Sequence, residues 1–112
     1  MIAFSRGDVV LVSFVYTDQA GAKLRPALVI SSGAFHASRE DVIVAAITSN
    51  VRRRLVGDHL IADWNGAGLL FPSIVTAICR TLKGAAIVRR LGSLAEQDQG
   101  AVDQELRRAL SL

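Results

Sequence analysis

Hydroxyl, amide and guanidinium groups are concentrated where an apolar run of the sequence ends. The apolar residues 42–47 lead directly into a polar cluster of Thr48, Ser49, Asn50, Arg52, Arg53 and Arg54. Hydroxyl and amide groups can donate hydrogen bonds to a phosphate, and arginines attract a polyanion and release its counterions. We interpret residues 48–54 as a candidate phosphate-binding segment. An ordinary strand end followed by a solvated loop is the alternative that these residue types leave open.

A second polar segment ends in an arginine whose backbone is restricted. Residues 17–25 contain the candidate side chains of Thr17, Asp18, Lys23 and Arg25, and Pro26 follows them. Because a proline favours extended backbone in the residue before it, the Arg25 side chain leaves the chain in a consistent direction. An arginine held in this way can stabilise negative charge that develops on a reacting phosphate. A guanidinium that lies in solvent at a strand edge is the alternative.

Metal, disulfide and membrane chemistry are not expected. Cys79 is the only cysteine, and His36 and His59 lie far apart in the sequence, so neither an internal disulfide nor a metal site is predicted. No apolar run approaches the roughly 20 residues of a membrane span, and Met1 to Asp8 lacks the pattern of a signal peptide. We therefore expect a cytoplasmic protein without a metal or other cofactor.

The composition indicates one small folded domain. The chain has 112 residues, of which 51% are hydrophobic and 21% charged, so intrinsic disorder is excluded and a single domain over residues 1–112 is expected. Lys and Arg number 13 against 10 Asp and Glu, and only Lys23 and Lys83 among those cations are lysines. Because arginine makes forked contacts to phosphate, this bias favours a polyanionic partner. A solvated basic surface is the alternative.

The elements that position these side chains are predicted to be β-strands. Apolar, β-branched runs occupy residues 9–16, 26–30, 42–47 and 74–82, with weaker candidates at 55–62 and 69–71. The connections between them are too short for crossover helices, so the sheet must be mainly antiparallel. Residues 9–15 are apolar on both strand faces, which favours a barrel-like sheet covered outside by a helix or a second subunit. An open sandwich with exposed valines is the alternative.

The period of the sequence changes to that of a helix near the C-terminus. Ser93 and Glu96 form a capping-box pattern, and Asp98 places negative charge near the expected start of the helix. Val102 and Leu106 then recur at helical spacing. We predict a C-terminal helix that packs on the barrel as a lid.

Five segments of the chain together resemble one protein family. They are residues 6–10, Lys23 to Ser31 (KLRPALVIS), Val42 to Ser49 (VIVAAITS), 68–75 and 87–94. In this order they cover nearly the whole chain, and the RPALV stretch followed by ITS is the most specific part. The chain is similar to the MazF/PemK-like toxin endoribonucleases of type II toxin–antitoxin systems, which are also called mRNA interferases.

This resemblance implies a fold, a reaction and partners. The implied fold is mainly β with a C-terminal α-helix, the SH3-like antiparallel barrel of the MazF/PemK/CcdB-like toxins. The implied reaction is sequence-selective cleavage of single-stranded RNA without a metal, by attack of a 2′-hydroxyl on the adjacent phosphate. The implied partners are a second copy in a homodimer and a cognate antitoxin whose acidic disordered segment occupies the groove.

The resemblance also implies which residues form the site. Arg25 and Thr48 match the catalytic pair of the family. The candidate RNA-binding residues are Thr17, Asp18, Lys23, Ser49, Asn50, Arg52, Arg53, Arg54 and Arg80. Arginine is a poor general base because its pKa lies above about 12. We therefore expect Arg25 to stabilise charge or donate a proton, and Thr48 to position the phosphate.

Two features of the sequence keep alternatives open. Val75 and Ala77 stand where some relatives carry an Arg-x-Asp pair, so the alternative function is an inactive barrel that binds nucleic acid or inhibits a protein such as DNA gyrase. Asp18 and His59 are candidate general bases by residue type only. A turn-capping aspartate and a partly exposed strand histidine are the alternatives for them.

Aromatic side chains that could stack a nucleic-acid base are few. Tyr16 and Trp64 adjoin polar loops and are the two candidates for stacking. Burial or a dimer contact is the alternative for each. Most of the aromatic side chains are expected in the core; they are Phe4, Phe14, Tyr16, Phe35, Trp64 and Phe71.

Overall fold

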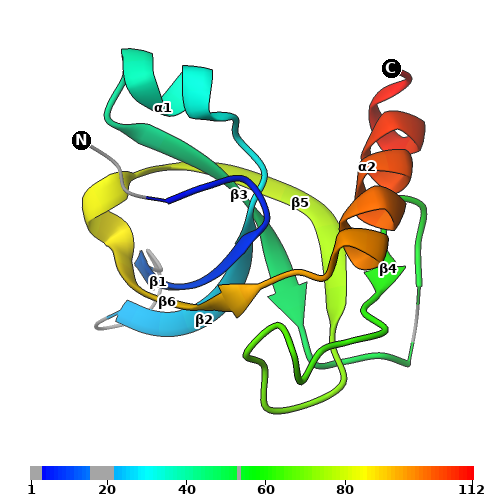
Figure 1. Ribbon diagram of the computed structural model, residues 1–112. Helices are drawn as coiled ribbons and strands as arrows, with labels where there is room; N and C mark the ends of the chain where they lie inside the picture. The colour runs from blue at the N-terminus through cyan, green and yellow to red at the C-terminus, as the bar shows by residue number, and fades with distance from the viewer. Residues whose placement is uncertain (1–3, 16–21, 53) are drawn as a thin grey trace.

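Six β-strands form one antiparallel sheet in the order β4-β5-β3-β2-β1-β6 (Figure 1). In this computed structural model the described residues are 4–15, 22–52 and 54–112. The strands are β1 (Asp8–Val15), β2 (Ala22–Val29), β3 (Asp41–Thr48), β4 (His59–Leu60), β5 (Ile74–Lys83) and β6 (Ile87–Ser93). The helices are α1 (Gly33–Ser38) and α2 (Glu96–Leu110), and a 3₁₀ turn, η1 (Gly84–Ala86), joins β5 to β6. The predicted fold class, mainly β with a C-terminal helix, is therefore confirmed.

The sheet curls because its strands are bulged as well as twisted. Strand pairing shifts register twice between β1 and β6, and once between β3 and β5 where Ala45 and Ile47 face β5. A bulge bends its strand and increases the local twist. The result is a curled half-barrel in which β6 lies beside β1 (Figure 1). The residues that enter β1 are therefore close to the segment that enters α2, where the Leu94 N–H donates to the Gly7 carbonyl at 2.9 Å.

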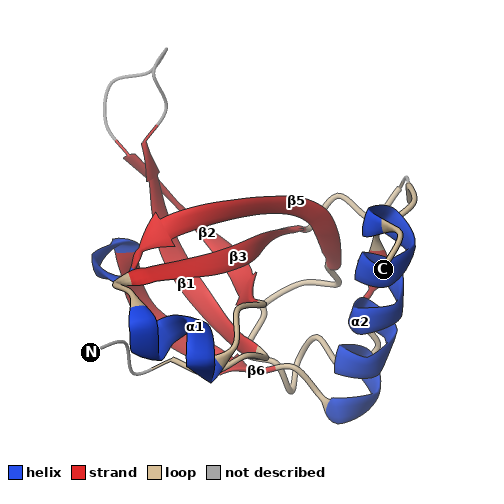
Figure 2. Ribbon diagram, turned by 90° about the horizontal axis from the view of Figure 1, so that it is seen from above, coloured by secondary structure: helices blue, strands red, loops and turns tan. Residues whose placement is uncertain are grey.

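Both faces of the sheet are covered, as the apolar run at 9–15 predicted. Val9 packs in one buried cluster with Leu28, Ile47, Val75, Leu94 and Val102, and Val10 and Val12 pack in another with Val29, Val42, Val44 and Ile87. Val9, Val10 and Val12 are each completely buried. Complete burial of one such side chain contributes about 1.5–3 kcal/mol. Helix α2 covers the first cluster through Val102 and contacts β4 and β5, far from α1 (Figure 2).

The predicted capping box of the C-terminal helix is wrong. Helix α2 begins at Glu96, and its N-cap is Ala95, which has no side chain to cap the helix. Ser93 ends β6 opposite Asp8, and its hydroxyl donates to Asp8 and accepts from Arg90. Ser93, which the local sequence pattern assigned to the helix start, is thus part of the β6–β1 pairing instead.

Two strand predictions also differ from the structure, and one strand was not predicted. The weak candidate at 55–62 contains only the two residues of β4, and 69–71 is not a strand. Residues 61–71 instead form turns, in which the Leu69 N–H donates to the carbonyl of Trp64 and the Leu69 side chain packs in the core. The sequence of residues 87–93 did not predict strand β6. Buried and exposed side chains do not alternate along this strand, so it lacks the usual period of two.

Two glycines allow the loop at 61–71 to lie directly against β6. A Cβ on Gly92 would lie 2.4 Å from the carbonyl oxygen of Ala67, and a Cβ on Gly68 would lie 2.1 Å from that of Leu91. Gly68 also has a φ of +86°, which a side chain disfavours. Because the opposing atoms are backbone, no side-chain rotation can relieve either contact.

We expect Gly92→Ala to destabilise the fold by about 1–3 kcal/mol, the usual cost of overpacking. The measurement is the free energy of unfolding from urea denaturation. Gly100→Ala in α2 is the matched control, because no atom lies within 4 Å of its added Cβ and alanine favours a helix. Equal changes in the free energy of unfolding for the two substitutions would show that the loop at 61–71 can move away from β6 at no cost.

Candidate active site

A groove of about 760 Å³ lies over the curled sheet and contains both predicted catalytic residues. Arg25 enters it from β2 and Thr48 from the end of β3. Its other lining residues are Leu11, Pro26, Ala46, Ile47, Ser49, Gly68, Leu69, Leu70, Phe71, Ser73, Ile78, Arg80, Arg89 and Leu91. Its volume falls in the range of small-molecule and cofactor sites. The two side chains therefore share one concave surface.

Strand pairing explains why cations from distant parts of the sequence meet there. Pro26 of β2 and Arg89 of β6 both pair with Leu11 of β1, so the chain segment at Arg25 lies two strands from Arg89. Adjacent strands are about 4.8 Å apart, which places the two backbones roughly 10 Å apart. Arg80 comes from β5, which is separated from β2 by β3 in the sheet. Strands on both sides of the centre of the sheet therefore contribute guanidinium groups to the groove.

Thr48 is held by the turn that follows its strand. It is the last residue of β3, opposite Ile74 of β5, and its Oγ1 accepts a hydrogen bond from the Asn50 N–H at 3.1 Å. A hydroxyl has one proton to donate and two lone pairs. Since the Asn50 contact uses a lone pair, the Thr48 proton can be donated to a ligand oxygen in the groove.

The predicted RNA-binding residues fall into three groups. Ser49 and Arg80 line the groove with Arg25 and Thr48. Lys23, Asn50, Arg52 and Arg54 are exposed but do not line it, and the Asn50 side chain accepts from the Arg52 N–H. Thr17, Asp18 and Arg53 lie outside the described residues, as does Tyr16. RNA binding stays a prediction for all three groups.

His59 is paired away from the groove. Its Nε2 donates to Asp98 Oδ1 at 2.7 Å, and Asp98 also accepts from the backbone N–H groups of Ala62 at 2.8 Å and Asp63 at 3.0 Å. Burial opposes ionisation of the Asp98 carboxyl, but these three hydrogen bonds outweigh it and hold its pKa below the ordinary value. The arrangement fits a structural clamp between α2, β4 and the loop at 61–71.

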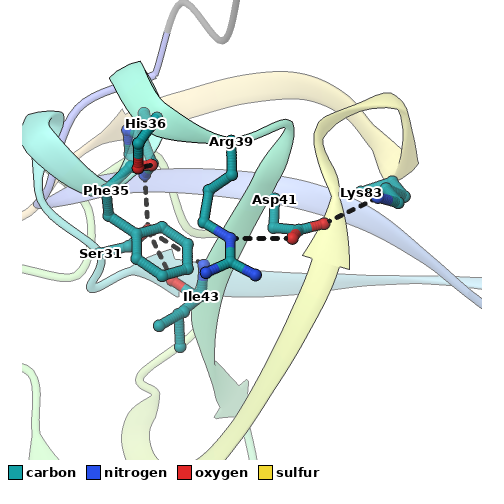
Figure 3. Close-up of polar contacts among 8 residues, drawn as sticks. Ser31, Phe35, His36, Arg39, Asp41, Ile43 and Lys83 are labelled. Atoms are coloured by element: carbon teal, nitrogen blue, oxygen red, sulfur yellow. Dashed lines mark hydrogen bonds and ion pairs between the residues drawn. The ribbon is translucent and has the colours of Figure 1, made fainter.

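His36 is a buried residue of α1 and is also hydrogen-bonded in the interior (Figure 3). Its Nδ1 donates to the Phe4 carbonyl at 3.1 Å, so its Nε2 accepts from the Ser31 hydroxyl. Ser31 Oγ accepts in turn from the Ile43 N–H at 3.0 Å. This network joins α1 to β3 and to the start of the described chain, which fits the structural interpretation of His36.

A surface ion-pair cluster lies next to that network (Figure 3). Asp41 accepts from Arg39 Nε and forms an ion pair with Lys83, each at 3.1 Å. The hydrogen bonds from Lys83 and then from Arg39 lower the pKa of Asp41. The Arg39 guanidinium also lies 4.9 Å from the centre of the Phe35 ring. The cluster joins the residues that follow α1 to Lys83 at the end of β5.

The described parts of the chain contain neither a metal-ligating cluster nor a membrane-spanning helix. Residues 4–15, 22–52 and 54–112 contain no group of three or more histidine, cysteine or acidic side chains that could hold a metal. Neither α1 nor α2, in that same part, is long and apolar enough to cross a membrane.

Several lining residues were not predicted as functional. Arg89, Phe71 and Ile78 complete the groove, yet none of them was assigned to the site. The available signal for Arg89 was its place in the family-like segment 87–94. The same signal exists for Phe71, which lies in the family-like segment 68–75. For Ile78 the sequence offers no signal, since an apolar side chain is more often buried.

Comparison with protein families gives one match over almost the whole chain. Residues 5–110 match the profile described as PemK-like, MazF-like toxin of type II toxin–antitoxin system. No curated protein matches the chain significantly.

Solved structures with the same fold cover nearly all of the chain. The toxin MazF-mt6 of Mycobacterium tuberculosis is 24% identical, with a TM-score of 0.77 over 94% of this chain and 97% of its own. An endoribonuclease in complex with its cognate antitoxin, from a mycobacterial species, is 21% identical, with a TM-score of 0.78 over 98% and 97%. MazF in a MazE–MazF complex of Deinococcus radiodurans is 18% identical, with a TM-score of 0.79 over 97% and 96%.

Proposed function

The chain belongs to the PemK-like, MazF-like toxins of type II toxin–antitoxin systems, and from this premise we propose that it is a metal-independent endoribonuclease for single-stranded RNA. The observation that carries the proposal is the meeting of Arg25 and Thr48 in one groove with Arg80 and Arg89. A groove with three guanidinium groups suits a polyanion. Similar structures described as endoribonucleases support the same activity.

In the proposed reaction the RNA supplies its own nucleophile. The 2′-oxygen bonds to the adjacent phosphorus while the bond from phosphorus to the 5′-oxygen breaks. The 2′-hydroxyl loses its proton, the 5′-oxygen gains one, and the products end in a 2′,3′-cyclic phosphate and a 5′-hydroxyl. Negative charge grows on the non-bridging oxygens, where fixed donors accelerate the reaction most.

Each member of the catalytic pair has one role in this proposal. Arg25 places a permanent positive charge beside the reacting phosphate and can donate hydrogen bonds to its oxygens. The Thr48 hydroxyl, oriented by the Asn50 N–H, donates to a non-bridging oxygen. The residue that accepts the 2′-hydroxyl proton is not assigned among the described residues. His59 is a poor candidate because it is bonded to Asp98 and does not line the groove.

The proposal includes partners and a location. Two similar toxins were solved with their antitoxins, so we propose a cognate antitoxin whose acidic, disordered segment occupies the arginine-lined groove. We also propose a homodimer in the cytoplasm, built from a single toxin domain over residues 1–112. Large exposed apolar side chains, which include Leu55, Val56, Leu110 and Leu112, provide surface for self-association.

The deciding experiment is incubation of the antitoxin-free protein with a mixed RNA in excess EDTA. We expect cleavage at a short recurring motif, with cyclic phosphate on the upstream product. Intact RNA after long incubation would overturn the proposal. Inhibition of DNA supercoiling by gyrase, together with intact RNA, would establish the inactive-barrel alternative. No feature of the groove favours that alternative, and Val75, at one of the departing positions, is a buried core residue.

RNA binding is expected to depend on salt because it is dominated by the groove cations. Three phosphate contacts, from Arg25, Arg80 and Arg89, predict a slope of log affinity against log salt concentration of about −2 for a single strand. The measurement is fluorescence anisotropy of a labelled RNA whose reacting 2′-hydroxyls are replaced by hydrogen. Arg89→Ala should make the slope shallower by about 0.7, whereas Arg108→Ala on α2 should leave it unchanged. A slope near zero would contradict a phosphate-binding groove.

A further inference from the structure

Phe71 is an exception to the expectation that most aromatic side chains lie in the core. Its side chain is 63% exposed and lines the groove with Arg25 and Thr48. Its neighbour Leu70 also lines the groove and is 82% exposed. The residues on either side, Leu69 and Ser73, are buried. The chain therefore displays two large apolar side chains between two anchored positions.

The backbone under Phe71 is held by several contacts, so its exposure is a fixed feature of the groove. The Ser73 hydroxyl donates to the Phe71 carbonyl at 2.8 Å, and the Leu69 N–H donates to the Trp64 carbonyl at 3.1 Å. Gly68, just before this turn, lies against the backbone of β6. An exposed aromatic ring on a well-anchored turn at the wall of a groove indicates a binding contact.

The chemistry of the groove selects the class of ligand. Its charged lining residues are Arg25, Arg80 and Arg89, and none of its described lining residues is Asp, Glu, Asn or Gln. A second copy of this chain, with a formal net charge of +3, would bring like charge to these cations. A ligand that pairs negative groups with flat apolar faces fits better, and single-stranded nucleic acid has both.

We propose that Phe71 is a stacking platform for a base that flanks the phosphate held by Arg25 and Thr48. The proposal rests on the proposed function and adds a binding residue to that site. A phenyl ring stacks on any base, because every base has a π-face. Phe71 therefore contributes affinity without reading sequence. Trp64, which packs against the core cluster, is not the platform.

The test compares KM and kcat of Phe71 variants on one short RNA substrate. We expect Phe71→Ala and Phe71→Leu each to raise KM about tenfold with little change in kcat, since stacking is worth about tenfold in affinity per base. Phe71→Trp should restore KM, because it restores a ring. Val88→Ala is the matched control, since Val88 is 54% exposed on β6 and does not line the groove.

Binding provides a second arm that does not depend on cleavage. On an RNA whose reacting 2′-hydroxyls are replaced by hydrogen, Phe71→Ala and Phe71→Leu should weaken affinity about tenfold. The Phe71→Trp variant should show fluorescence quenching beyond that of Trp64, the only tryptophan of the natural chain. Weaker binding by these variants supports the stacking platform even if the wild-type protein does not cleave RNA. Failure of wild type to cleave would overturn only the proposed function.

Three results would overturn the platform. The first is a Phe71→Ala variant that cleaves RNA with the KM and affinity of wild type. This result would reject the stacking role of Phe71 and leave the proposed endoribonuclease activity unaffected. The second is wild-type behaviour of Phe71→Leu, which would reduce the contact to apolar bulk. The third is a lower mass of Phe71→Ala by sedimentation with unchanged RNA affinity, which would assign Phe71 to an interface between copies.

Discussion

Arg25→Ala is expected to lower kcat for RNA cleavage by about 10²- to 10³-fold, the usual effect of removing one fixed donor from a developing negative charge. The loss should lie mainly in kcat, because the charge that Arg25 stabilises is greater in the transition state than in the bound RNA. Arg25→Lys should recover part of the rate, since it restores the charge without the forked donors. The measurement is single-turnover cleavage of a labelled RNA.

The controls separate a lost catalytic group from a lost fold. Arg25 is exposed, so its substitution should leave circular dichroism and the unfolding free energy unchanged. Arg108→Ala removes an equally exposed cation from α2, outside the groove, and should cleave at the wild-type rate. Thr48→Val should lose activity and Thr48→Ser should retain most of it, because only serine keeps the hydroxyl. Unaltered cleavage by Arg25→Ala would remove Arg25 from the catalytic pair.

Arg25 and Thr48 could be selected as candidates from the sequence, but their shared groove could not be predicted. Pro26 after Arg25, and hydroxyls at the end of an apolar run before Arg52, are local signals that short segments carry. Their meeting depends on the pairing of β2 with β3 and on the bulge between β3 and β5. Such contacts join residues distant in sequence, and no local pattern encodes their register.

The differences between the sequence-based expectations and the structure have a common physical cause. Contacts with residues distant in the sequence override a strong local pattern. Ser93 has the right spacing for a capping box, yet it ends β6 opposite Asp8. Phe71 has the residue type of a core side chain, yet the turn around it buries Leu69 instead. For His59, where two interpretations were open, the carboxylate of Asp98 binds the ring and favours the structural one. In each case a partner far along the chain decides the outcome.

Asp98→Ala is expected to destabilise the protein by about 3–5 kcal/mol, the cost of removing one partner from a buried pair. Asp98 is 2% exposed, and its loss leaves His59 and the N–H groups of Ala62 and Asp63 without their acceptor. The measurement is urea denaturation at neutral pH. Asp103→Ala is the matched control on the same helix, since its ion pair with Arg6 is partly exposed and should contribute at most about 1 kcal/mol.

The same carboxylate makes a prediction about acid, with a definite sign. Because the pKa of Asp98 is lower in the folded protein than in the unfolded chain, ionisation stabilises the fold at every pH above the unfolded value of about 3.9. As pH falls below that value towards the folded pKa, the unfolded state gains the proton first and this stability is lost. Asp98→Asn should therefore lose less stability than wild type between pH 5 and about pH 2. Parallel curves for the two proteins would mean that Asp98 is not held as an ionised acceptor, and that the loop leading to Phe71 is fixed by packing alone.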